Sequence, residues 1–319
     1  MLGPDAVALA TQLSKELGLS PAKISQLFGE QFGISITPGG VVGAIARQAR
    51  VLEPTYAALC AGMRASPVVA PDETGWRVDG SKAWLWAFVG EGVSVYRIAA
   101  GRGYEQAVEV LGAEFSGTLE RDGWAPYRRF GGASHQSCLA HLLRRCREMI
   151  ADSIAGQARI PHALRRILED ALALRAERER GTIDAAQLAL RVGELEMRAE
   201  QLLERNPTHR PNQRLLRHLT AERRHLFTFL THDGVEATNW RAEQAIRPAV
   251  VNRKKWGGNR SRRGARAQEV AMSVIRTARQ QEVDPIELMA AAQREPTPKA
   301  AAMLRIPTRA SPVELEDPA

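Results

Sequence analysis

Residues 67–78 read "PVVAPDETGWRV" and open a run of three short segments rich in valine and aromatic side chains. The other two are "KAWLWAFVG" at residues 82–90 and "GVSVYRIAAG" at residues 92–101. Turns that contain glycine, Asp79-Gly80 and Glu91-Gly92, separate the three segments. Such short runs joined by tight turns are typical of antiparallel strands. The sequence therefore predicts a three-stranded meander, and this meander determines the fold class.

The chain beyond the meander mixes helix and strand signals. Residues 104–115 have helical spacing, and residues 116–130 predict a strand that ends near Asp122. Residues 133–150 predict a short strand that leads into a basic helix. The resulting order is three strands, helix, strand, helix, which indicates a mixed α/β fold instead of a regular alternation.

Two other regions have helical patterns only. Residues 1–66 predict short helices, with Ser20 as an N-cap before Pro21; they are compatible with a helix-turn-helix or with a small helical packing unit. Residues 151–234 have apolar positions three and four apart, which predicts an all-helical insertion, or alternatively a coiled-coil arm.

The insertion is predicted to split one α/β domain into two parts, residues 67–150 and residues 235–292. A final segment, residues 293–319, combines mixed charge with five prolines in the last 24 residues. That composition predicts a disordered tail.

The charge is unevenly distributed. Lysine and arginine number 44 against 36 acidic residues, and the stretch 244–268 has no acid at all. A local surplus of this kind suits a polyanion, above all nucleic acid, although a solvated basic loop is the alternative. Eight basic residues lie in the stretch: Arg247, Arg253, Lys254, Lys255, Arg260, Arg262, Arg263 and Arg266.

Compartment signals are also present in the sequence. The three cysteines are too few and too scattered for a disulfide framework, which fits a reducing compartment. The N-terminus has no signal-peptide pattern, and we find no apolar run of about 18 residues. We expect a cytoplasmic, nucleoid-associated protein without a membrane span.

Glu243 lies on a predicted helix that begins after an N-cap at Thr238. Asn239, Glu243 and Arg247 follow at spacings of four and so share one face. Pro248 is predicted to stop or kink this helix.

Three acids could form a metal site. Asp72 is expected at the end of the first strand, Asp122 at the end of a later strand, and Glu243 on a distant helix. Chemistry with two metal ions needs hard oxygen ligands that converge from separate elements. Spacing alone leaves a second interpretation open, in which the aspartates are turn residues and Glu243 pairs with Arg247.

Four blocks of the sequence resemble successive blocks of the DDE transposase domain of the insertion-sequence-66 family. The blocks are "APDETGWRV" (70–78), "RDGWAPYRRF" (121–130), "HQSCLAHLLRR" (135–145) and "NWRAEQAIRPAVVNRKKW" (239–256). The resemblance runs from about Leu52 to about Leu288, and the last block is the most specific. It implies a ribonuclease-H-like fold. Full-length members usually carry a cysteine-rich segment upstream, so we expect an N-terminally short member.

The resemblance implies that Asp72, Asp122 and Glu243 are the catalytic acids and that they hold two Mg²⁺ ions, for which Mn²⁺ could substitute. It also implies transposon ends and target DNA as partners, and a homo-oligomer. The family block around "C-x-A-H" carries a histidine at the position of His141, so His141 and Asn239 are predicted to line the site.

Other interpretations of single motifs are weaker. Cys138 and His141 have usable zinc spacing, but a second ligand pair at standard separation is missing from the sequence. The segment "KKWGGNRSRRG" lacks the order of a phosphate-binding Walker loop. Trp256 could stack on a DNA base while the basic residues around it contact the DNA backbone. Alternatively, Trp256 could anchor the loop.

The sequence thus predicts a transposase that cleaves DNA ends and transfers strands. Two alternatives stay open: a catalytically idle, transposase-derived DNA-binding protein, and a ribonuclease-H-like nuclease that cuts without joining.

Overall fold

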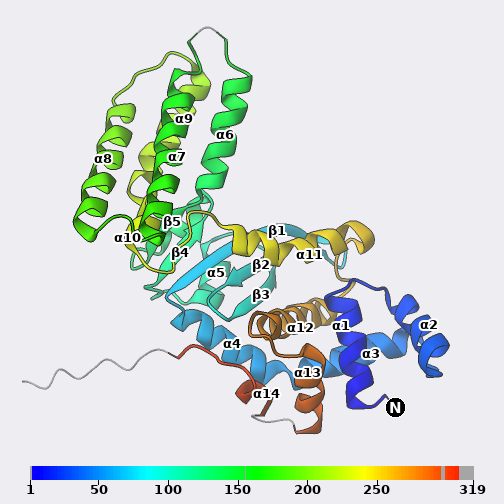
Figure 1. Cartoon of the computed structure of the whole chain (residues 1–319). Coiled ribbons are helices and arrows are strands. Elements are labelled where there is room, and N and C mark those ends of the chain that lie inside the picture. Colours follow the sequence, from blue (N-terminus) through cyan, green and yellow to red (C-terminus); the bar gives the residue numbers. More distant parts are fainter. Residues whose placement is uncertain (1, 155, 296–298, 309–319) are drawn as a thin grey trace, which may run out of the picture. The chain divides into compact units, whose positions relative to one another are not determined.

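The chain forms two compact units in the computed structural model, which describes residues 2–154, 156–295 and 299–308 (Figure 1). The first unit comprises Met1–Phe115 and Arg241–Ala319, and the second comprises Ser116–Trp240.

The first unit contains the predicted antiparallel meander. Strands β1 (Val68–Val78), β2 (Ser81–Val89) and β3 (Ser94–Ala99) are ordered β3-β2-β1. The turn between β1 and β2 has positive φ at both Asp79 and Gly80 (52° and 72°), as the tightest hairpin turns require. The Asp-Gly pair therefore sets the register of the hairpin, and the meander prediction is confirmed.

Helices α11 (Trp240–Trp256) and α12 (Arg262–Gln280) supply apolar side chains to the core of this sheet. Ala70, Trp76 and Val78 alternate along β1, so they share one face of the strand. The small residues Ala242 and Ala245 of α11 belong to the same buried cluster. These side chains place the apolar side of α11 on the face of β1 that carries Ala70.

The segment between α11 and α12 pairs with the end of β1, where Asn259 forms a parallel bridge with Val78. The Asn259 N–H donates to the Arg77 carbonyl, and the Asp79 N–H donates to the Asn259 carbonyl, both at 2.9 Å. Asn259 also accepts a 2.7 Å hydrogen bond from the Trp76 indole. Gly258 has φ of +133°, and a Cβ there would lie 2.3 Å from the Arg77 carbonyl oxygen. Glycine is therefore required for this close approach.

The N-terminal region folds as four helices of the first unit. They are α1 (Pro4–Lys15), α2 (Pro21–Phe32), α3 (Pro38–Val51) and α4 (Glu53–Ala65). Ser20 caps α2 as predicted, since its hydroxyl accepts from the Lys23 N–H. The Gln48 side chain donates to the Met289 carbonyl on α13 (Pro285–Arg294), which ties α3 to the C-terminal helices.

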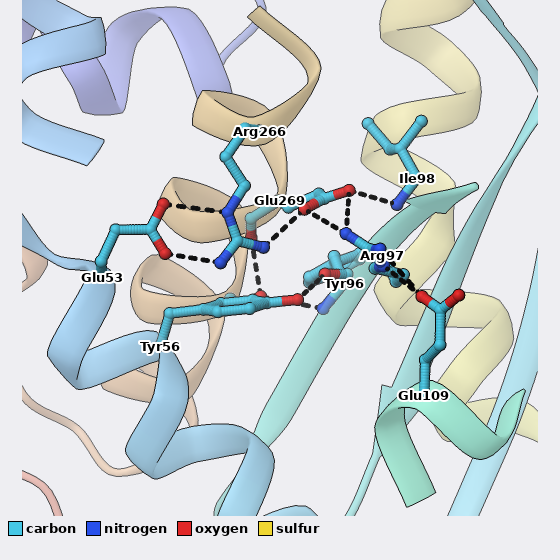
Figure 2. A network of polar contacts seen from close by, with 9 residues as sticks. Glu53, Tyr56, Tyr96, Arg97, Ile98, Glu109, Arg266 and Glu269 are labelled. Carbon is cyan, nitrogen blue, oxygen red and sulfur yellow. Dashed lines mark hydrogen bonds and ion pairs between the residues drawn. The ribbon is translucent and has the colours of Figure 1, made fainter. Parts of the chain in front are cut away.

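A charged network joins α4 to the sheet (Figure 2). Arg266 pairs with Glu53 and, at 2.7 Å, with the buried Glu269. Glu269 also pairs with Arg97 and accepts from the Ile98 N–H on β3. Arg266 therefore joins α4 to α12, and the Glu269 carboxylate joins α12 to β3. Arg97 further pairs with Glu109 on α5 (Tyr104–Leu111).

The structure describes part of the segment predicted to be a disordered tail, and the disorder itself stays a prediction. A short helix, α14 (Lys299–Ala302), follows α13, and Leu304 is buried. Ile306 lies against Gly62 of α4. Residues 296–298 and 309–319 of the predicted tail lie outside the described residues.

The second unit combines two strands with a set of helices. Strands β4 (Thr118–Arg121) and β5 (Ser134–Ser137) are parallel and flank a short 3₁₀ helix, η1 (Ala125–Arg129). The rest of the unit is helical: α6 (Leu139–Ala151), α7 (Arg159–Glu179), α8 (Ala185–Leu203), α9 (Arg210–Glu222), η2 (Arg223–His225) and α10 (Thr228–Thr231).

Helices α6 to α9 pack side by side (Figure 1). Of these, α7 to α9 lie within residues 151–234, where the sequence predicts helices only. The chain therefore has an α/β fold whose strands pair both antiparallel and parallel, which confirms the predicted mixed α/β class. Across the described ranges, none of the helices has the length and apolar character to cross a membrane.

Candidate functional site

Asp72 lies inside β1, so the prediction that it ends the strand is wrong. It is paired with Ala87, and the strand continues for six more residues because its pairing with β2 extends to Val78. The Asp72 side chain is half-buried, and its Oδ1 accepts from the Glu73 N–H at 2.9 Å. Strand alternation places Asp72 on the face of Ala70, which is the face that α11 covers.

Glu73 has a different environment from Asp72. Its buried carboxylate is paired with Arg102 at 2.6 Å. The Arg102 guanidinium in turn lies 4.9 Å from the centre of the Trp84 ring. This ion pair and cation–π contact give Glu73 a structural role in the sheet.

Helix α11 carries Glu243 in its first turn, with the side chain exposed. The helix begins at Trp240, so the predicted N-cap at Thr238 is wrong by one residue. It also continues through Pro248, where a stop or kink was predicted. The buried alanines on one side, such as Ala245, hold the helix against the sheet and offset the hydrogen bond that proline cannot make.

The C-terminal part of α11 is attached to β1. The Arg253 guanidinium donates to the Thr74 hydroxyl at 3.0 Å and to the Gly75 carbonyl. The Trp256 ring packs edge-on against Trp76, with centroids 6.4 Å apart. These contacts assign Arg253 and Trp256 an anchoring role. They also correct the predicted loop, because residues 253–256 are helical.

The other predicted DNA-binding residues are exposed. Lys254 and Lys255 lie in the last turn of α11, and Arg262 and Arg263 lie in the first turn of α12. Arg247 and Arg260 are exposed as well. Arg266, the last basic residue of the run, instead forms ion pairs with Glu53 and Glu269.

Two further cations lie next to Arg253 and were missed in the sequence. Arg77 and Lys82, which flank the β1–β2 turn, line an open hollow of about 550 Å³ together with Trp84 and Arg253. The Lys82 ammonium lies 5.6 Å from the Trp84 ring centre. The available signal was a basic residue on each side of the predicted hairpin turn.

Asp122 directly follows β4, as predicted, and belongs to the second unit. Its Oδ1 accepts from the Trp124 N–H at 2.9 Å, which closes a tight turn over Gly123. Asp72 and Glu243 belong to the first unit. The structure thus places Asp72 and the helix of Glu243 on one face of a sheet, and the convergence of all three acids stays a prediction.

Asn239 contacts the residue that precedes helix α6, and His141 lies on that helix. Asn239 is buried, and its N–H donates to Cys138 Sγ at 3.3 Å, directly before helix α6. His141 is half-buried in the first turn of α6. Their role as site-lining residues stays a prediction.

The donor chemistry of the predicted acids fits a hard cation. Asp72, Asp122 and Glu243 offer only carboxylate oxygens, which Mg²⁺ and Mn²⁺ prefer. Cys138 and His141, whose ligand atoms lie within 4.8 Å of each other, would suit zinc better.

Residues 1–267 match the sequence model of the family described as "Transposase IS66 family". The match begins at the first residue, well before Leu52, so it includes the N-terminal helices. It also spans Asp72, Asp122, Glu243 and the whole basic run. A search of curated proteins found no match.

Proposed function

Because the chain belongs to the IS66 family of transposases, we propose that it cleaves DNA at the ends of an insertion sequence and joins the freed ends to target DNA. Asp72, Asp122 and Glu243 are the proposed catalytic acids. The family gives the chain a transposase role, and such a role requires binding to DNA.

One observation carries this proposal: the position of α11 along β1. Arg253 contacts β1 at Thr74 and Gly75. Glu243 lies ten residues earlier, which is about 15 Å of helix. A strand covers that distance in about four or five residues. Glu243 is therefore expected at the level of residues 69–71, next to Asp72 along the strand and on the face where Asp72 lies.

The residues divide the work of phosphodiester chemistry. When bound, a pair of divalent ions activates the attacking oxygen and stabilises the leaving oxygen. Asp72 is positioned by β1 and the Glu73 amide, and Asp122 by the Trp124 amide. Glu243 has one more methylene group, which lets it reach across from its helix.

Two successive substitutions at phosphorus complete the proposed reaction. In the first, water attacks the phosphorus at the transposon end, a new P–O bond forms and the bond to the 3′-oxygen breaks. In the second, the freed 3′-hydroxyl attacks a target phosphodiester and displaces its 3′-oxygen. Neither step needs a covalent bond between protein and DNA. Two copies of the chain would hold the two ends, so we propose a homo-oligomer.

The test uses a DNA duplex that carries a pre-cut insertion-sequence end. Asp72→Asn, Asp122→Asn and Glu243→Gln remove one negative charge each with little change in shape. We expect each to reduce Mg²⁺-dependent joining by at least about 100-fold, because the metal ligands act in both steps. The affinity for DNA should stay unchanged. Glu91→Gln, an exposed carboxylate at the β2–β3 turn, is the matched control and should join at the wild-type rate.

Each alternative has its own outcome. A wild-type protein that binds the end but performs no metal-dependent reaction would be an idle DNA-binding protein. A wild-type protein that cuts DNA and yields no joined product would be a nuclease.

A further inference from the structure

We propose that the end of helix α9 holds the Asp122 turn in place, and that Glu222 is the positioning residue at its centre. We call Arg121, Arg128, His218 and Glu222 the α9 clamp. All four belong to the second unit, as does Asp122. The catalytic part of this inference rests on the proposed role of Asp122.

Glu222 is the last residue of α9, and its side chain is fully buried. Its carboxylate accepts from three donors: Arg121 Nη1 at 2.8 Å, Arg128 Nε at 2.9 Å and the Ser137 hydroxyl at 2.5 Å. The helix end is therefore joined to β4, to η1 and to β5 through one side chain.

Arg121 links Glu222 to the main chain of Asp122. It is the last residue of β4 and has no exposed side-chain surface. The same Nη1 that binds Glu222 donates to the Asp122 carbonyl at 3.2 Å, and Nε donates to His135 Nδ1 at 3.1 Å. The guanidinium is thus fixed from several directions, and so is the main chain at the start of the turn.

Arg128 holds the next residue of the turn, and His218 packs against it. Arg128 Nη2 donates to the Gly123 carbonyl at 3.3 Å while its Nε binds Glu222. A Cβ on Gly123 would lie 2.4 Å from His218 Cε1 on α9. Glycine at this position is what allows the helix to lie directly against the turn.

The charges in the clamp favour a geometric role. Burial raises the pKa of Glu222, but Arg121, Ser137 and Arg128 outweigh it and lower the pKa overall, so Glu222 is a carboxylate. A buried ion pair adds little net stability over apolar packing, because both charges must be desolvated. What it does provide is a defined position for each partner. Here the partners of Glu222 are Arg121 and Arg128, which bind the main chain at Asp122 and Gly123. The proposed role of Asp122 requires that this turn be accurately placed.

The first experiment compares Glu222→Gln, Arg128→Ala and the control Arg224→Ala. Arg224 is an exposed arginine two residues from Glu222 and controls for the loss of one charge near the clamp. Deuterium exchange of residues 118–130 is measured in the full-length protein, alongside the joining rate and DNA affinity. Arg128 is 36% exposed, so its alanine variant is expected to fold even if Glu222→Gln does not.

We expect faster exchange confined to residues 118–130 in both clamp variants. Joining should fall about 10- to 100-fold for Glu222→Gln, as for other residues that orient a metal ligand, and less for Arg128→Ala. The DNA dissociation constant should stay within about twofold. Unchanged exchange at the turn would overturn the inference, and so would an equal increase throughout the second unit.

The second experiment tests the contact between α9 and the turn directly. Gly123→Ala should reduce joining about tenfold or more, since small misplacements of a catalytic group are costly. Adding His218→Ala removes the clashing ring and should restore most of the lost rate. If the double variant is as slow as Gly123→Ala, the contact does not control the turn.

The two proposals can fail separately. A wild-type protein that joins no DNA would overturn the proposed function and the catalytic role of the clamp. The exchange measurement would still decide whether the end of α9 holds the Asp122 turn.

Discussion

His135 is a buried histidine whose surroundings disfavour its protonated form. Its Nδ1 accepts from Arg121, and its ring packs against His225 with centroids 5.1 Å apart. Burial, and next the positive charge of Arg121, lower the pKa of His135 to about 4. The ring Nε2–H can donate to the Phe130 carbonyl, 3.2 Å away, which suits the neutral form.

This environment predicts a loss of stability in mild acid. Between about pH 6.5 and pH 4 the unfolded chain takes up a proton on His135 and the folded chain does not. The free energy of unfolding should therefore decrease as the pH falls through this window. For this one group the slope is up to about 1.4 kcal/mol per pH unit.

Urea unfolding at several pH values between 7 and 4.5 measures the slope. His135→Gln keeps a polar side chain of similar length but does not titrate, so its slope should be shallower than that of the wild type. His218 and His225 also have lowered pKa values and will leave a remaining slope. Identical slopes for wild type and variant would show that His135 does not control the effect.

The accuracy with which the sequence located single residues differs from residue to residue. Asp122 and its turn could be located from sequence because Asp-Gly after a short predicted strand is a local signal. Asp72 was given the wrong place within its strand, since the length of β1 depends on pairing with β2. The clamp residue Glu222 left no signal, because its partner Arg121 lies about a hundred residues away.

Helix α11 carries basic residues of two kinds at its C-terminal end. Arg253 is bound to β1, and Lys254 and Lys255 are exposed. Changing both lysines to alanine should weaken DNA binding for all sequences. It should also reduce the slope of log K against log salt by about two, one unit for each lost phosphate contact. Stability should change by no more than about 0.5 kcal/mol.

Arg253→Ala is the matched comparison for the lysine variant. It removes hydrogen bonds to Thr74 and Gly75, so we expect it to lower the free energy of unfolding by about 1–3 kcal/mol. Fluorescence anisotropy over a range of KCl concentrations and urea unfolding separate the two effects. Equal effects of both variants on stability, or equal salt slopes in the lysine variant and the wild type, would contradict this division.

Elements were predicted in type but not in their limits. The meander was found because tight glycine turns divide three apolar runs. In α11, the predicted N-cap was one residue too early, and the helix does not stop at Pro248, because the buried alanine face holds it against the sheet. Tertiary contacts of this kind cannot be inferred from one helix alone.

At the level of the whole molecule, the N-terminal helices form part of the first unit and pack against its core. Tyr56 donates to the Tyr96 carbonyl, Gln48 to the Met289 carbonyl, and Glu53 pairs with Arg266. Deleting residues 2–66 would expose the apolar sides of α12 and α13. We expect the remaining chain to lose cooperative unfolding and to aggregate.

Circular dichroism melts and size-exclusion chromatography of residues 67–319 test this expectation. Arg50→Ala, an exposed change on α3, is the control and should melt like the wild type. A truncated chain with a wild-type melting curve would show that the N-terminal helices are an independent domain. Sequence could predict these helices but not their partners, because Gln48 and Glu53 contact residues more than two hundred positions away.

The pairing of Asn259 with the end of β1 has a consequence for contacts between molecules. Main-chain groups left unpaired beside the last residues of a strand can recruit a strand from a neighbouring molecule. Asn259 already occupies the Arg77 carbonyl and the Asp79 amide. The chain thus covers these main-chain groups with a segment of its own and so guards against amyloid-like growth. The many positive charges of that segment also keep molecules apart.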